Sequence, residues 1–393
     1  MCNYSSCCKR IGFTFILILL MCLPFSVSKI AYATDESLQE ELNENIDKVL
    51  NDIDFSGLDQ DAAMVPNLNL SFGDLVKEIL NGNYSSDYGS IFEYVKDIFL
   101  DNFYTYLRFF ISLFVIVVLF EILRTFSDNR LKEMKNAFKL IFSFLIATTI
   151  LLVVKDLFSN IKDIVEGLFS FASILFPILI GLLTLSGSVK SATVFSSFSV
   201  FLLETGAFIL RYVLLPISLS ILLLSLFSSI FSKGQFSKLN NLFKSAFKYI
   251  FIIFFSIFGL LSTVNVITSS THDGINLKLT KYALKNYIPI LGGYVSEGFD
   301  FIFSCSVLVK NAIGVCSLIV LLFKVLMPVI IIIFFSFGFK VLSALTALIG
   351  DGGFAQMFDD VSNSFGNFLS VIIGSFLIVF VFVFLVILSV GVA

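Results

Sequence analysis

Long uninterrupted runs of apolar residues constrain the fold of this chain more than any other feature of its sequence. About 20 apolar residues in a helix cross a hydrocarbon layer of about 30 Å. Runs near that length lie at 104–123, 138–154, 164–185, 192–210, 212–231, 247–268, 301–322, 325–348 and 367–391. Charged residues make up 14% of the chain, where a soluble domain carries about 25%. The sequence predicts an all-α, polytopic transmembrane helical bundle in residues 102–393, with about 8–10 spans.

The N-terminus has the pattern of an export signal. Lys9 and Arg10 precede the apolar run 11–27, and small residues follow at the ends of the tripeptide 31–33. A signal peptidase requires small residues at these positions. We therefore expect a signal peptide over residues 1–33, and an uncleaved first span is the alternative.

The next segment, residues 34–101, is strongly acidic. It carries 16 acidic residues against three lysines. Ser71 with Asp74, and Ser90 with Glu93, have the spacing of capping boxes that open helices. We expect an extracytoplasmic helical segment here, either a solvated hairpin or a docking surface. So much negative charge argues against nucleic acid as a partner.

Basic residues cluster after two of the predicted spans. One cluster is Arg124, Arg130, Lys132, Lys135 and Lys139, and the other is Lys233, Lys238, Lys244 and Lys248. Cytoplasmic loops are enriched in Lys and Arg. One orientation satisfies both clusters, with the N-terminal segment outside and both loops in the cytoplasm. This predicts a multi-pass protein of the cell membrane, although the acidic loop 349–365 gives the C-terminal spans no such support.

The chain contains signs of an internal repeat. Four of the six prolines form two pairs that are each 112 residues apart: Pro177 with Pro289, and Pro216 with Pro328. The segment 137–142 also matches 246–251 at an offset of 109. Matches at a nearly constant offset favour a duplication over chance. The predicted units are 136–231 and 245–348, each with four membrane segments.

Proline and glycine interrupt corresponding segments of the two units. Pro289, Gly292 and Gly293 do so in the second unit, and Pro177 and Gly181 do so in the first. Proline removes a backbone donor, and freed carbonyls at membrane depth require protein or water as partners. We therefore expect broken or re-entrant helices that line a pathway or a packed seam. Simple kinks that improve helix packing are the alternative.

Charges inside the predicted spans are few, and burial makes each one costly. Glu204 and Arg211 are seven residues apart and are expected to share one helix face. Arg211 and Lys324 precede corresponding proline motifs. Either these basic residues reach toward the interface from helix ends, or Glu204 and a basic partner from the other repeat unit line a polar cavity.

The sequence offers little support for an enzyme. Its single histidine, His272, lies in a predicted loop, which leaves neither a Ser-His pair nor a histidine-rich metal site. No glycine-rich phosphate loop is present. Cys305 and Cys316 lie eleven residues apart on one predicted helix, too far for a disulfide. We expect no catalytic residues, metal or cofactor.

Several stretches resemble the stage III sporulation protein AE family of endospore-forming bacteria. They are DGINLK at 273–278 with Lys281, NYIP at 286–289, LVKNAIG at 308–314 and RYVLLP at 211–216. The order of a signal peptide, an acidic helical segment and a membrane domain fits the same family. The resemblance is most specific between residues 270 and 316.

The resemblance implies a place in a multi-protein channel complex in the mother-cell membrane around the forespore. The implied partners are other stage III sporulation membrane proteins, a forespore-made protein in the intermembrane space, and the lipid bilayer. Two functions stay open. The chain forms part of a feeding conduit with a solute path along its interrupted helices, or it is a non-conducting scaffold that assembles single-span ring proteins.

Overall fold

A computed structural model describes residues 46–65, 70–81, 88–126, 132–230, 235–287, 292–350 and 352–389. The predicted signal peptide, Pro66 and Pro289 lie outside these ranges. After a helical stretch at 46–51, two short helices follow, α3 (Asp59–Ala62) and α4 (Phe72–Leu80). The long elements are α5 (Tyr88–Phe126), α6 (Lys132–Leu185), α7 (Val189–Phe201), η1 (Leu202–Gly206), η2 (Phe208–Leu214), α8 (Leu215–Ile230), α9 (Gln235–Tyr287), α10 (Gly292–Ile349) and α11 (Gly352–Leu388). The all-α prediction is confirmed, with no strand in the described ranges.

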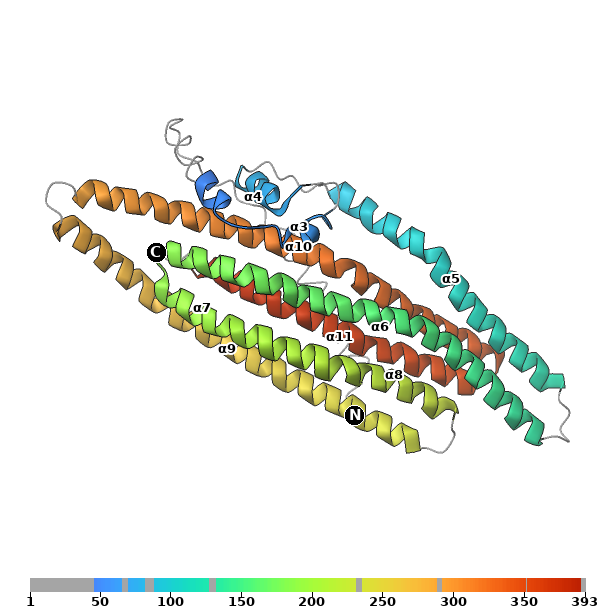
Figure 1. The fold of residues 1–393 in the computed structure, drawn as a ribbon. Helices are drawn as coiled ribbons and strands as arrows, with labels where there is room; N and C mark the ends of the chain where they lie inside the picture. The colour runs from blue at the N-terminus through green and yellow to red at the C-terminus, as the bar shows by residue number, and fades with distance from the viewer. Residues whose placement is uncertain are drawn as a thin grey trace.

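Long helices run side by side along one elongated bundle (Figure 1). Six helical stretches of the described chain are long and apolar enough to cross a membrane: Phe103–Thr125, Ala137–Leu185, Val189–Ser228, Phe236–Asn265, Phe303–Ile349 and Gly352–Leu388. The ends that carry the two basic clusters lie at the same end of the bundle (Figure 1). We call this the basic end.

Three predicted breaks between spans are wrong, because in each case the two neighbouring apolar runs belong to the same continuous helical rod. Runs 138–154 and 164–185 are joined in α6, and runs 301–322 and 325–348 are joined in α10. Runs 192–210 and 212–231 are joined through η1 and η2. Hydropathy drops at polar residues, but an α-helix satisfies its own backbone groups and continues through them. The described chain therefore has six candidate spans, where the sequence predicts about 8–10.

The same continuity changes the content of the two predicted repeat units. Unit 136–231 consists of α6 and the α7–α8 rod, and unit 245–348 contains most of α9 and α10. The prediction of four membrane segments per unit is wrong, because each unit contains two long helices. The duplication itself stays a prediction.

The C-terminal helix α11 lies at the centre of the bundle. It packs against α10, α8 and α6, and buried residues occur on all of its faces. No charged residue occurs between Val361 and Leu388. A helix that is apolar all round is typically buried. The sequence predicts this segment as one more span, and in the structure it forms the core of the bundle.

Two glycines permit unusually close packing of α10. A Cβ added at Gly314 would lie 2.5 Å from Ile387 Cγ1 of α11. A Cβ at Gly338 would overlap the ring of Phe110 from α5. Because real Cβ contacts of this length do not occur, a larger residue at either site would force the facing side chain or its helix to move.

The described residues of the acidic segment before α5, 46–65 and 70–81, form a small module whose helices α3 and α4 lie on the side of α10. Ser71 Oγ accepts a hydrogen bond from the Asp74 backbone N–H at 3.2 Å. This confirms the predicted cap at the start of α4. Leu58, Val65 and Phe72 are buried in the module.

Candidate functional site

Lys324, which the sequence singled out, joins three parts of the chain. It lies within α10, and its side chain is 8% exposed. Its ammonium group donates to Asp61 Oδ1 of α3 at 2.5 Å and to the Gly167 carbonyl of α6 at 3.0 Å. The ammonium also lies 5.7 Å from the ring centroid of Phe171. We call this arrangement the lysine junction.

The lysine junction differs from both predictions for Lys324. The residue is not at a helix end, because α10 continues to Ile349. Its bonding partners are protein groups, one of them from the acidic N-terminal segment. A buried ammonium is costly unless it is paired and hydrogen-bonded. Lys324 therefore ties the N-terminal module to the membrane domain.

Arg211 forms a second interhelical contact, on the other side of α6. Its guanidinium lies 2.7 Å from Glu166 Oε1, and it stacks over the ring of Tyr212 at 5.1 Å. Glu166 is one residue before Gly167, so both basic residues contact the same turn of α6. The lysine junction and the Arg211–Glu166 pair together form a polar level halfway along the bundle.

Glu204 and Arg211, which the sequence predicts on one helix face, are not an ion pair. Glu204 is exposed, and the ion-pair partner of Arg211 within the described chain is Glu166. Both residues lie in π-helical segments, η1 and η2. The expectation assumed α-helical spacing, and the wider turns of a π-helix shift side chains around the axis. The polar pair is therefore formed between helices and not along one.

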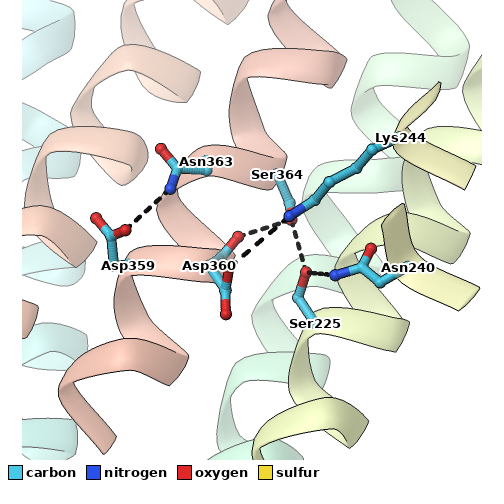
Figure 2. Close-up of polar contacts among 7 residues, drawn as sticks. All are labelled: Ser225, Asn240, Lys244, Asp359, Asp360, Asn363 and Ser364. Carbon is cyan, nitrogen blue, oxygen red and sulfur yellow. Dashed lines mark hydrogen bonds and ion pairs between the residues drawn. The ribbon is translucent and has the colours of Figure 1, made fainter. Parts of the chain in front are cut away.

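A second polar cluster lies nearer the basic end, between α8, α9 and α11. Figure 2 shows Lys244 reaching toward Asp360, with 3.7 Å between the ammonium and Oδ1. Asn240 donates to Ser225 Oγ at 3.0 Å, and Ser225 lies 3.3 Å from Ser364. These contacts fix the register of the central helix against its two neighbours. The sequence predictions did not include this cluster.

Lys310 has a structural role in α10. It is fully buried, and its ammonium donates to the carbonyls of Val386 at 2.8 Å and Ile387 at 3.3 Å. These carbonyls belong to the last turn of α11, where a helix lacks internal donors and carries partial negative charge. Lys310 thus caps the central helix.

The interrupting prolines lie within continuous helices wherever the structure describes them. Pro177 is inside α6 and Pro328 is inside α10. Pro216 lies in the first turn of α8, directly after η2. A broken or re-entrant helix at Pro177 is therefore wrong, because α6 continues to Leu185, and the kink alternative stays a prediction.

The glycines of the same motifs give less information. A Cβ at Gly181 would have no neighbour within 4 Å, so Gly181 serves no close approach here. Gly292 and Gly293 are the first residues of α10. The proposed break at Pro289 lies outside the described residues and stays a prediction.

Other groups considered for chemistry are simple in the described part of the chain. Cys305 and Cys316 are buried free thiols, as predicted. No three His, Cys, Asp or Glu side chains gather into a metal site within the ranges searched. Asp61 and Glu166 were not predicted as partners. For Asp61, the contrast between the acidic segment 34–101 and the basic membrane domain was a usable signal.

Comparison with known proteins identifies the family of this chain. The sequence model of a family described as stage III sporulation protein AE matches residues 70–391. The stage III sporulation protein AE of Bacillus subtilis (strain 168) is 27% identical over 202 residues, which cover 51% of this chain and 51% of that protein. The match thus spans about half of the curated relative's length. No solved structure matches. Since the family model covers the membrane bundle, the module helix α4 and both basic clusters, this chain belongs to the stage III sporulation protein AE family.

Proposed function

We propose that this protein is the membrane-embedded component of the channel complex that connects mother cell and forespore during sporulation. Its family supports a role in sporulation, and its six apolar helical stretches support a multi-pass membrane location. We place it in the mother-cell membrane around the forespore, with the N-terminal module outside the cytoplasm. The two basic clusters at one end of the bundle support this orientation.

We further propose that a single chain acts as a scaffold and does not conduct solute along its own axis. The observation that carries this is the position of α11. Phe365, Val371 and Phe382 of this helix are at most 1% exposed, and Phe382 stacks on Phe176 of α6 with ring centroids 3.7 Å apart. Packed apolar side chains leave no polar groups to replace the hydration shell of a solute.

The same geometry provides an anchor for partners. The N-terminal module is held to the membrane domain by the lysine junction, which fixes its position relative to the bilayer. The partners we propose are single-span stage III sporulation proteins of the same complex, together with a forespore-made protein in the intermembrane space. We propose no enzymatic activity, metal or cofactor for this chain.

Reconstitution tests the scaffold function against the conduit. The full-length chain would be placed in liposomes that contain entrapped calcein and radiolabelled amino acids, with empty liposomes as the control. We expect efflux equal to the control, while detergent extracts of sporulating cells yield the chain together with its single-span partners. Efflux above the control would refute a closed axis, whether or not the change of Phe382 to alanine alters that efflux.

A further inference from the structure

The length of α6 raises the question of where lipid covers this protein. The helix has 54 residues, which is roughly 81 Å at 1.5 Å per residue. A hydrocarbon core of about 30 Å, crossed at a tilt of 40°, covers roughly 39 Å or 26 residues. A single bilayer therefore covers about half of α6 at most.

The exposed side chains of α6 change in kind partway along the helix. Toward the basic end they are large and apolar: Leu140, Ile141, Phe144, Leu145 and Leu152 are 42–65% exposed. From Lys155 to Thr184 the exposed residues are Lys155, Asp156, Ser159, Asn160, Lys162, Asp163, Glu166, Ser170, Ser173, Pro177, Gly181 and Thr184. This second stretch, which we call the polar face, contains no exposed large apolar side chain. Its buried side remains apolar, with Leu168, Phe171 and Leu175 in the core.

The neighbouring helices change at the same level. Among the α10 residues whose burial is described, from Phe303 onward, the exposed large apolar residues all follow Lys324: Ile333, Phe337, Val341, Leu345 and Leu348. On α5 they extend from Leu100 to Leu123, a length of roughly 35 Å. Tyr104, one turn inside this band, is 71% exposed, and tyrosine is enriched at membrane interfaces.

The N-terminal module gives an independent indication. Asp61 bonds to Lys324, and a Cβ on Gly57 would lie 2.8 Å from Ile174 Cδ1, so the module rests beside α6 at residues 167–174. The module also exposes charged residues such as Asp52 and Asp54. Charges of this kind require water. The level of α6 beside the module is therefore aqueous.

We propose that, on the face formed by α5, α6 and α10, the bilayer contacts only the exposed apolar bands near the basic end. Helix α6 leaves the lipid at Lys155, and its polar face up to Thr184 stands in water beside the N-terminal module. The partner of the apolar bands is the lipid hydrocarbon. The run 164–185, which reads as a membrane span by hydropathy, is then the core-facing part of an extramembranous helix.

The exposed apolar residues of α9, from Leu239 to Val264, give the other side of the bundle its own band. This band begins near the basic end, as the bands on the other side do, because Lys244 close to its start contacts Asp360 near the start of α11.

Site-directed spin labelling of the full-length chain in lipid nanodiscs tests the proposal. Thr148 and Ser173 are a matched pair, because both are exposed on α6 and their hydroxyls donate only to carbonyls of the same helix, Phe144 and Ser170. A nitroxide would be attached in the variants Thr148→Cys and Ser173→Cys. Their collision rates with dissolved oxygen, which concentrates in lipid, and with a neutral nickel chelate, which stays in water, would be compared.

We expect the label at residue 173 to collide at least tenfold more often with the nickel chelate than the label at residue 148, and the label at 148 to prefer oxygen. A label at residue 173 that prefers oxygen would overturn the proposal. So would low collision rates with both reagents at 173, because the polar face would then be buried against protein. Both variants leave the lysine junction and the core intact. A misfolded chain would be recognised by the label at residue 148, which would then collide equally often with oxygen and with the nickel chelate.

Discussion

Replacing Asp61 with asparagine removes one half of the lysine junction. At an effective dielectric constant of about 20, opposite unit charges about 2.5 Å apart attract by roughly 6 kcal/mol, and desolvation offsets part of this. Removal of one partner from a buried pair costs about 3–5 kcal/mol. Lys324 keeps the Gly167 carbonyl as an acceptor. We therefore expect Asp61→Asn to weaken the attachment of the module by the lower value, about 3 kcal/mol of free energy.

Hydrogen exchange of the α4 backbone amides in the full-length chain measures this attachment, because exchange follows local opening. A loss of about 3 kcal/mol corresponds to exchange faster by roughly a hundredfold. The control variant is Asp47→Asn. Asp47 lies 3.2 Å from Lys77, but the two side chains are 55% and 44% exposed, so its loss costs about 0.2–1 kcal/mol. The double variant Asp61→Asn with Lys324→Met should recover much of the lost protection, since it leaves no unpaired charge.

Two outcomes would refute this reasoning. One is an effect of Asp61→Asn on α4 exchange no larger than that of Asp47→Asn, because the junction would then behave as an exposed pair. The other is a double variant whose loss equals the sum of the two single losses, because the two side chains would then be energetically independent.

Three further predictions concern the central helix. Gly314→Ala places a Cβ 2.5 Å from Ile387 and should lower stability in detergent by about 1–3 kcal/mol. The control Gly181→Ala, with open space around the added Cβ, should leave stability unchanged or slightly raised. Equal melting temperatures for the two variants would contradict the close packing at Gly314. Lys310→Met removes the donor to two buried carbonyls and should lower the free energy of unfolding by about 1–3 kcal/mol, measured by thermal unfolding. An unchanged free energy of unfolding would mean that water replaces the ammonium. Phe382→Ala should cost about 3–5 kcal/mol in the same assay, and a cost below that of an exposed control would contradict the central position of α11.

The membrane class and helical fold followed from the sequence alone, because they depend on local properties. Runs of apolar residues long enough to cross a bilayer must form helices there, since each backbone group needs an internal partner. The cap at Ser71 was predictable for the same reason, as it requires only residues three positions apart. The basic clusters likewise fall at one end of the bundle.

Tertiary structure alone decided which residues meet. Lys324 bonds to Asp61, which lies 263 residues away in sequence. No helical spacing connects such a pair. Likewise, Arg211 pairs with Glu166 of another helix and not with Glu204 on its own rod. Partner choice depends on how rods are placed against one another, which local periodicity does not specify.

The remaining differences between the sequence prediction and the structure concern which helix forms the core and where helices are interrupted. The composition of α11 identified it as apolar, but only its burial by α6, α8 and α10 makes it the core. Hydropathy also divided α6 into two spans, although its backbone is continuous. Hydropathy averages the buried and exposed faces of a helix. The packed structure separates them, and that separation distinguishes residues that contact lipid from residues that contact protein.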